Sequence, residues 1–188
     1  MKTSVTTLCT LLFGAVLLSS CDKCGESTIT MVTEDDAKWL VYDGKDTIRF
    51  VNEANLPVNY VRTRLTSENV PGEGYSLDDK CIDQLDTQVG NIIQDVRSQQ
   101  PGLATYILRR PNNLTVQLLV EGRGAYEINE STPTYPSLEV DGTVYNNVFE
   151  VKKDSTAATS VKRILFNKEV GFISVELYGG KKLRRVQS

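Results

Sequence analysis

The sequence predicts a mainly β protein, folded as a single antiparallel β-sandwich or open barrel of about ten strands. Short runs of β-branched and aromatic residues recur roughly every 8 to 15 residues, separated by glycine, proline and asparagine. Two Asp-Gly dipeptides, Asp43-Gly44 and Asp141-Gly142, follow such runs and are typical of tight hairpin turns. The chain lacks the strand–helix alternation that a parallel sheet requires.

The N-terminus has the order of a secretory signal: Lys2, an apolar stretch over residues 11–18, and small residues before Cys21. Leu18-Ser19-Ser20-Cys21 resembles a lipobox, the bacterial sequence at which a signal peptide is cut and the new N-terminal cysteine receives lipid. We therefore expect a helical signal peptide over residues 1–20, a tether lipidated at Cys21 over residues 21–27, and one β-rich domain over residues 28–188. The alternative is an ordinary secretory signal in which Cys21 is incidental.

The cysteine count predicts one disulfide. Cys9 would leave with the signal peptide and Cys21 would be joined to lipid, so Cys24 and Cys81 remain. In an oxidising envelope compartment two remaining cysteines are expected to pair. Separate thiols are the alternative, but Cys24 lies in a polar segment where burial is not expected.

The first half of the domain contains three predicted strand regions. Residues 29–32 form a short β-rich run. Residues 39–42 and 47–51 flank Asp43-Gly44 and are predicted to form a hairpin. Residues 58–65 alternate imperfectly between apolar and polar positions.

Residues 78–98 are ambiguous between helix and strand. Their apolar residues fall at spacings of three and four, as on one helix face, and the alternative is one helix here. Against a helix stand Gly90 and many β-branched residues, which are poor helix formers. We favour a strand, with Gly90-Asn91 as a bulge or turn.

The second half is more clearly β. Strands are expected at 104–108 and 114–120 around a Pro-Asn-Asn turn, then at 125–128, and at 138–140 and 143–145 around Asp141-Gly142. A further strand is expected at 148–151, followed by three closing strands at 161–166, 172–178 and 182–186. Gly122 and Gly124 indicate a bulge or turn, because the third glycine of a dinucleotide fingerprint is missing.

Several of these strand and turn residues form a loose pattern: Trp39, Phe50, Cys81, Gly142-x-x-Tyr145-x-x-Val148 and Phe166-x-x-x-x-Gly171-Phe172-Ile173. This pattern resembles envelope lipoproteins of the Bacteroidota that have no assigned activity. The resemblance covers most of the chain after Cys21. It implies a β-rich fold and an envelope location and carries over no catalytic residue.

Composition excludes several classes of chemistry. The chain has no histidine, which removes histidine-dependent nucleophiles and histidine metal ligands, and with them the usual zinc sites. Removing residues 1–20, whose one charge is Lys2, leaves 20 basic and 24 acidic residues. That balance does not suit a general nucleic-acid binder. We expect no cofactor and no metal.

Three side-chain groups remain candidates for function. Glu34-Asp35-Asp36 and the acids Asp78, Asp79, Asp83 and Asp86 offer carboxylates for calcium or for glycoside hydrolysis, but they lack calcium-loop spacing, and solvated surface charge is the simpler interpretation. Trp39, Tyr42, Tyr60, Tyr106 and Tyr126 line either a ligand groove or the core. The basic terminus, residues 181–185, either contacts anionic headgroups or protects a sheet edge.

The sequence thus predicts a lipid-anchored envelope protein, at the outer membrane or cell surface, with a non-enzymatic binding or structural role. Its partners would be the membrane, through the N-terminal lipid, and an envelope protein or glycan. The alternatives are a carboxylate-dependent glycan hydrolase, which needs two converging acids, and a lipid or lipoprotein carrier, which needs an apolar concavity.

Overall fold

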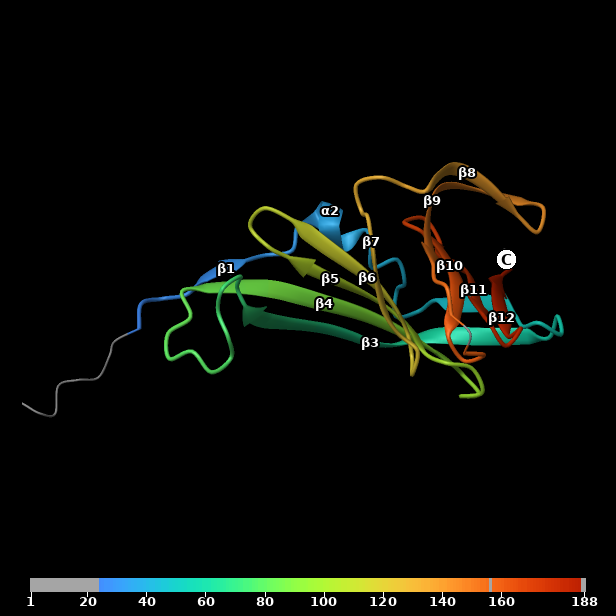
Figure 1. Ribbon diagram of the computed structural model, residues 1–188, viewed down its shortest axis with the longest axis horizontal. Helices are drawn as coiled ribbons and strands as arrows, with labels where there is room; N and C mark the ends of the chain where they lie inside the picture. Colours follow the sequence, from blue (N-terminus) through green and yellow to red (C-terminus); the bar gives the residue numbers. More distant parts are fainter. Residues whose placement is uncertain (1–23, 156, 187–188) are drawn as a thin grey trace, which may run out of the picture.

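The computed structural model describes residues 24–155 and 157–186. The expected signal peptide at residues 1–20 and the expected lipidation site Cys21 lie outside these residues. The described chain is mainly β, as predicted, and forms one curled, largely antiparallel sheet that makes an open half-barrel (Figure 1). Among the described residues, the only helix is α2 (Glu34–Ala37).

The sheet has 12 strands, and eleven of them follow the spatial order β7-β6-β5-β4-β3-β2-β12-β11-β10-β9-β8. Their bounds are β1 Thr28–Thr30, β2 Thr47–Val51, β3 Pro57–Pro71, β4 Gln84–Asp95, β5 Leu103–Arg109, β6 Leu114–Val120, β7 Gly124–Ile128, β8 Tyr135–Val140, β9 Thr143–Lys152, β10 Val161–Asn167, β11 Gly171–Leu177 and β12 Lys182–Arg185. Most neighbours in this order are also consecutive in the chain, joined by short turns. β7 also lies near β9, so the curled sheet comes close to closing on itself.

Strand β1 joins the start of the described chain to the sheet. It pairs in parallel with β4, with Thr30 opposite Asp86, whereas β5 takes over on the same side of β4 from Thr87 onward. β1 therefore extends the line of β5. The long β3–β4 ribbon, which carries β1 at one end, projects from the body of the molecule (Figure 1).

Alternation along the strands separates a core face from an outer face. Within β4, Val89 and Ile93 are buried in the main core, while Gln88 and Gln94, next to them in the strand, point the other way. A strand with this two-residue period has one face toward the core and one toward solvent. The main core lies inside the curl of the sheet.

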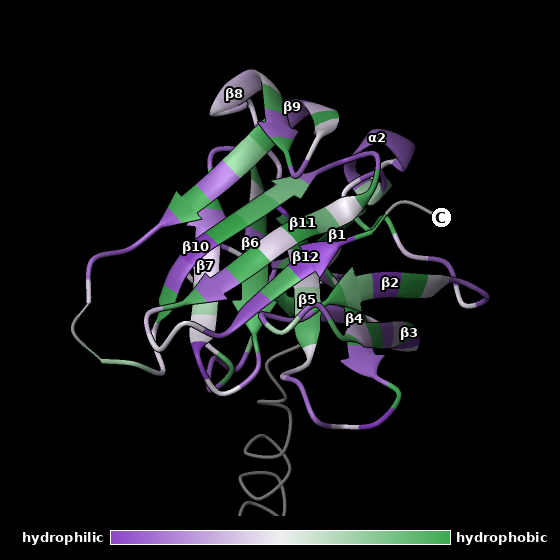
Figure 2. Ribbon diagram, turned by 90° about the vertical axis from the view of Figure 1, so that its right-hand side faces the viewer, coloured by the Kyte–Doolittle hydropathy of each residue, from purple (hydrophilic) through white to green (hydrophobic). Residues whose placement is uncertain are grey.

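The β8–β9 hairpin covers the outer face of the last strands. Hydrophobic residues dominate β10 and β11 (Figure 2), and both faces of these strands are buried. Ile164 and Phe166 belong to the main core, whereas Leu165 and Ile173 pack with Tyr145 of β9 in a second apolar cluster. The predicted Asp141-Gly142 hairpin is confirmed, with φ of 51° and 81° at the two turn residues, as a type I′ turn requires.

The predicted hairpin at residues 39–51 is wrong in its first half. Residues 39–42 form no strand; they follow α2, which begins at the N-cap Thr33. Thr33 and Asp36 make a capping box, in which each side chain accepts a hydrogen bond from the other residue's backbone N–H. Gly44 does not have the positive φ of a type I′ turn. The chain after α2 therefore crosses the inside of the curl instead of pairing with β2.

Trp39 and Tyr42 fill the inside of the curl. The Trp39 ring lies 4.9 Å from the Phe149 ring and 6.1 Å from the Phe166 ring, measured between centroids. The Tyr42 hydroxyl oxygen accepts a 2.7 Å hydrogen bond from the backbone N–H of Phe172 on β11. These contacts join the N-terminal crossing segment to the C-terminal strands.

The ambiguous segment at residues 78–98 contains strand β4, and the helix alternative is wrong. Gly90 is not a bulge or turn, because it pairs within the ladder with Thr66 on β3 and Tyr106 on β5. The bulge in this ribbon lies on β3, between Arg62 and Arg64. The apolar residues at helical spacing do not share one face: Val89 lies in the core, Ile92 lies on the outer face, and Val96, just after the strand, is exposed. Periodicity alone does not separate such a short apolar segment from a helix.

The predicted edge role of the basic terminus is also wrong. β12 lies between β11 and β2, inside the sheet. Its cations have local partners: the Arg184 guanidinium lies 3.0 Å from the Asp141 carboxylate, and Arg185 donates a 2.7 Å hydrogen bond to the Val170 carbonyl. These arginines therefore hold the sheet to the neighbouring turns.

Candidate functional site

The predicted disulfide is confirmed. Cys24 and Cys81 are bonded, with their Cα atoms 5.3 Å apart. The bond fastens the first described residue to the loop over residues 72–83, which joins β3 to β4. Ser27 adds a second tie at the same place, because its hydroxyl donates a hydrogen bond to the Ile82 carbonyl.

The first acidic cluster, Glu34-Asp35-Asp36, lies in the first turn of α2. Asp35 is exposed, and its hydrogen bond to the Lys38 ammonium, 2.8 Å long, lowers the pKa of its carboxyl group. Asp36 is buried, caps α2 and lies 3.7 Å from the Arg109 guanidinium. Asp35 is paired with a lysine and Asp36 caps a helix, so the two carboxylates do not converge on a ligand site.

The second acidic cluster is mainly structural. Asp79 accepts a 2.6 Å hydrogen bond from the Ser76 backbone, and Asp83 accepts one of 3.3 Å from the Tyr75 hydroxyl. Asp78 is exposed. Within residues 24–155 and 157–186, no three potential ligands of the His, Cys, Asp or Glu type gather as a metal site.

Asp86 is the buried member of this cluster, with a relative exposure of 0%. One carboxylate oxygen accepts a 3.2 Å hydrogen bond from the Gln84 amide, and the other lies 4.0 Å from Arg110 Nε. Arg110 also lies 4.0 Å from the Glu73 carboxylate. Arg110 thus lies near two carboxylates at the base of loop 72–83, and the Asp86 oxygen that faces it accepts no hydrogen bond from the described residues.

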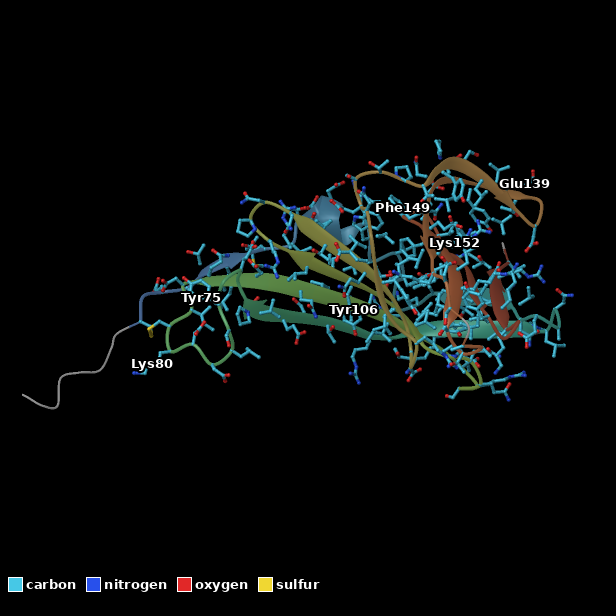
Figure 3. All side chains as sticks on the ribbon, viewed as in Figure 1. Tyr75, Lys80, Tyr106, Glu139, Phe149 and Lys152 are labelled. Atoms are coloured by element: carbon cyan, nitrogen blue, oxygen red, sulfur yellow. A yellow bond between two sulfur atoms is a disulfide. The ribbon has the colours of Figure 1, made fainter. Side chains whose placement is uncertain are left out.

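The five candidate aromatic residues divide between the core and the surface. Trp39, Tyr42 and Tyr60 are buried, and Tyr126 packs partly buried against the same core. Burial raises the pKa of both the Tyr42 and Tyr60 hydroxyls far above the usual value. Tyr106 is different, because it projects from the outer face of β5, near the middle of the sheet (Figure 3).

Tyr106 forms one wall of an open groove on the outer face of β3–β6, with a volume of about 280 Å³. The ladder registers place Ile92, Ala104 and Leu119 in one row across β4, β5 and β6. These apolar side chains belong to the floor of the groove. The groove is lined by Thr63, Arg64, Ile92, Gln94, Gly102, Leu103, Ala104, Tyr106, Leu119 and Glu121.

Small residues create the hollow and set the position of the tyrosine ring. Gly102 and Ala104, which precede Tyr106 along the chain, contribute no long side chain to the groove. A Cβ atom at Gly90 would collide with the Tyr106 ring and with Thr66. Gly90 therefore lets the Tyr106 ring lie over the neighbouring strand, which positions the ring as a wall of the groove.

The polar rim combines donors and acceptors. Arg64 supplies a guanidinium, Gln94 an amide and Thr63 a hydroxyl. Glu121 is fixed in place, because one of its carboxylate oxygens accepts a 2.8 Å hydrogen bond from the Gly102 backbone N–H. Glu121 is the one carboxylate among the lining residues, so the groove holds no acid pair.

Aromatic side chains fill the inside of the curl. Trp39, Phe50, Tyr60 and Phe166 are buried there with relative exposures of 0–1%. The Lys168 ammonium lies 4.3 Å above the Trp39 ring. The concave side of this half-barrel is thus a filled core.

A second open hollow lies where β2 turns into β3, lined by residues that include Leu56, Val96, Arg97 and Asp95. Its carboxylate is already engaged, because Asp95 accepts backbone hydrogen bonds from Arg97, Gln99 and Gln100. No aromatic side chain lines it. The groove beside Tyr106 is therefore the stronger candidate for ligand binding.

No protein-family model, curated protein or solved structure matches this chain. Within the part of the chain that the structure describes, no helix is long and apolar enough to cross a membrane.

The groove itself was not predicted from the sequence, although Tyr106 was named as a candidate. The sequence feature that could have indicated the groove is a set of small residues within or beside strands: Gly90, Gly102 and Ala104. Small residues in a strand interior mark places where another group approaches closely. Only the strand register reveals that all three lie around one tyrosine.

Proposed function

We propose that this protein is a lipid-anchored, non-enzymatic module of the cell envelope that binds a saccharide in the outer-face groove beside Tyr106. The observation that carries the proposal is the composition of the groove: one aromatic wall, an apolar floor and a rim of Arg64, Gln94 and Glu121. Ligand sites typically combine apolar surface with a few placed polar groups.

A sugar ring suits both parts of this surface. The negatively polarised face of an aromatic ring attracts the C–H groups that a pyranose presents on its apolar side. Hydroxyl groups both donate and accept, so they pair with a guanidinium, an amide and a carboxylate on one rim. The near balance of donors and acceptors favours a neutral saccharide over a strongly charged one.

The other two candidate functions have less support. A two-carboxylate hydrolase needs acids about 5–10 Å apart across the scissile bond, and the groove contains only Glu121. A lipid carrier needs an apolar hollow, and Trp39 and its neighbours occupy the inside of the curl. In this proposal the protein is attached to a membrane through a lipid on Cys21, and it lies at the outer membrane or the cell surface.

The test is binding of the purified domain, residues 21–188 with Cys21→Ser, to an array of envelope oligosaccharides that contain hexose and N-acetylhexosamine units. We expect one saccharide class to bind and calorimetry to measure its affinity. Tyr106→Ala should lower that affinity at least about tenfold, because loss of an aromatic contact and its desolvated area costs more than about 1.4 kcal/mol. Tyr106→Phe should keep most of the affinity.

Tyr178→Ala is the matched control, since Tyr178 is also partly exposed and lies on the chain after β11, outside the groove. It should bind like the parent domain. Absence of binding to every saccharide, or equal losses for Tyr106→Ala and Tyr178→Ala, would refute the saccharide site.

A further inference from the structure

Covalent geometry places loop 72–83 close to the proposed lipid. Cys24 follows Cys21 by three residues, so their Cα atoms are at most about 11 Å apart whatever path the chain takes. The disulfide holds the Cα atom of Cys81 5.3 Å from that of Cys24. Loop 72–83 lies at the end of the molecule where the described chain begins, as the positions of Tyr75 and Lys80 show (Figure 3).

This loop presents a leucine to solvent. Leu77 has a relative exposure of 84%, the highest among the exposed large hydrophobic residues of the described chain. It lies inside a tight turn: the Asp79 N–H donates to the Ser76 carbonyl at 3.1 Å, and the Asp78 N–H donates to the Ser76 hydroxyl at 3.2 Å. These hydrogen bonds hold the turn that presents Leu77 to solvent.

From these observations we infer that loop 72–83 rests on the leaflet that holds the N-terminal lipid, with Leu77 in the headgroup region. The inference rests on the proposed lipid modification of Cys21. An apolar side chain held at a bilayer surface enters about 5–10 Å into the boundary between headgroups and acyl chains. Because Cys24 is only three residues from the proposed lipid on Cys21, the disulfide keeps the loop close to that boundary.

The charges of the loop limit the depth and the kind of membrane. Asp78 and Asp79 follow Leu77 directly, with Lys80 beside them, and Glu73 and Asp83 lie at the ends of the loop. Carboxylates are repelled by an anionic surface and favour the hydrated headgroup layer. The contact is therefore shallow, and it is stronger on zwitterionic lipid than on anionic lipid.

The contact also orients the binding groove. Two covalent points, the lipid tether and the disulfide, act at one end of the β3–β4 ribbon, and the β8–β9 hairpin lies at the other end (Figure 1). The body then projects from the leaflet, with the hairpin far from it. The outer face of β3–β6, with Tyr106, faces sideways, where a saccharide beside the protein can reach it.

The experiment places a nitroxide label at Leu77→Cys in the lipidated protein, in vesicles of phosphatidylcholine and phosphatidylethanolamine. The readout is the accessibility of the label to oxygen, which concentrates in the bilayer, and to a water-soluble nickel chelate. We expect the label at 77 to be several-fold less accessible to nickel than in the lipid-free protein. Adding phosphatidylglycerol should weaken this protection.

Val144→Cys is the matched control. Val144 is also an exposed apolar residue, with a relative exposure of 60%, and it lies in the β8–β9 hairpin. Its label should stay fully accessible to nickel on vesicles. Replacing Cys24 and Cys81 together by serine in the Leu77→Cys protein should release the loop and restore nickel access while the protein stays bound. Vesicle flotation, measured in parallel, reports anchoring alone.

A protein that floats with vesicles but leaves the 77 label as exposed as the 144 label would overturn the membrane contact and leave anchoring intact. A protein that does not float would instead refute the anchoring on which the contact rests.

Discussion

Tyr42 is the residue that ties the two ends of the domain together. It lies 130 positions before Phe172 in the chain, yet its hydroxyl oxygen accepts the Phe172 backbone N–H. The neighbouring Gly171 has a φ of 80°, and a Cβ there would collide with the Tyr42 ring. A glycine at this turn therefore serves two needs, a left-handed backbone and room for the tyrosine.

Burial of Tyr42 and Tyr60 predicts loss of stability at alkaline pH. The pKa of each hydroxyl is raised in the folded state by burial, whereas the unfolded chain releases these protons near pH 10. Below about pH 10 the two tyrosines do not reduce the free energy of unfolding. Above that pH, each of them lowers the free energy of unfolding by up to about 1.4 kcal/mol per pH unit.

Urea unfolding between pH 8 and 12 measures this loss. The double variant Tyr42→Phe with Tyr60→Phe should be less stable at neutral pH, because the Phe172 N–H and the Pro101 carbonyl lose their hydroxyl partners. Its stability should nevertheless fall less steeply above pH 10. Parallel slopes for the two proteins would contradict the assignment.

At the scale of elements, the disulfide and β1 act as one clamp on the N-terminal segment. Cys24–Cys81 closes a loop with a sequence separation of 57, and β1, inside that loop, pairs with the start of β4, just after Cys81. Closing a loop of this length is worth about 4 kcal/mol by the chain-entropy model. Replacing both cysteines by serine should therefore lower the melting temperature by about 8–16 °C for a domain of this size.

A matched control for the clamp is Ser27→Ala, which removes only the hydrogen bond to the Ile82 carbonyl. It should lower the melting temperature by a few degrees at most, corresponding to about 1 kcal/mol. An unchanged melting temperature in the double serine variant would show that the disulfide does not stabilise the fold.

The elements differ in how well local sequence predicts them. The Asp141-Gly142 hairpin and the closing strands β10 and β11 were predictable, because turn chemistry and alternation agree there. Residues 39–42 have equally β-like side chains, yet they cross the core. Trp39 gains more by burial against Phe149 and Phe166 than a strand edge offers, and that gain is a tertiary effect.

The order of the strands in the sheet could not be predicted from the sequence. β12 is the last strand of the described residues, and its cations suggested an edge, but it pairs with β2 from the first half of the domain. The walls of the groove, in contrast, come from the consecutive strands β3–β6: Arg64, Tyr106 and Glu121 meet there because each of these strands pairs with the next one in the chain. Residue types alone do not determine which strands neighbour one another.

The two ends of the whole molecule carry different features. One end carries Cys24, the disulfide and Leu77; the opposite end carries the β8–β9 hairpin; and the Tyr106 groove lies on the side between them (Figures 1 and 3). The net charge of the full sequence is −3, so the protein is weakly acidic. Membrane attachment in this account depends on Cys21 alone.

The most direct test of this account is the mass of the mature N-terminus, measured on the protein extracted from membranes of the bacterium that expresses it. The account predicts a chain that begins at Cys21 and carries a diacylglyceryl group, and a Cys21→Ser variant that retains its signal peptide and lacks lipid. A mature chain cut at another residue, or one that begins at Cys21 without lipid and is released in soluble form, would contradict it.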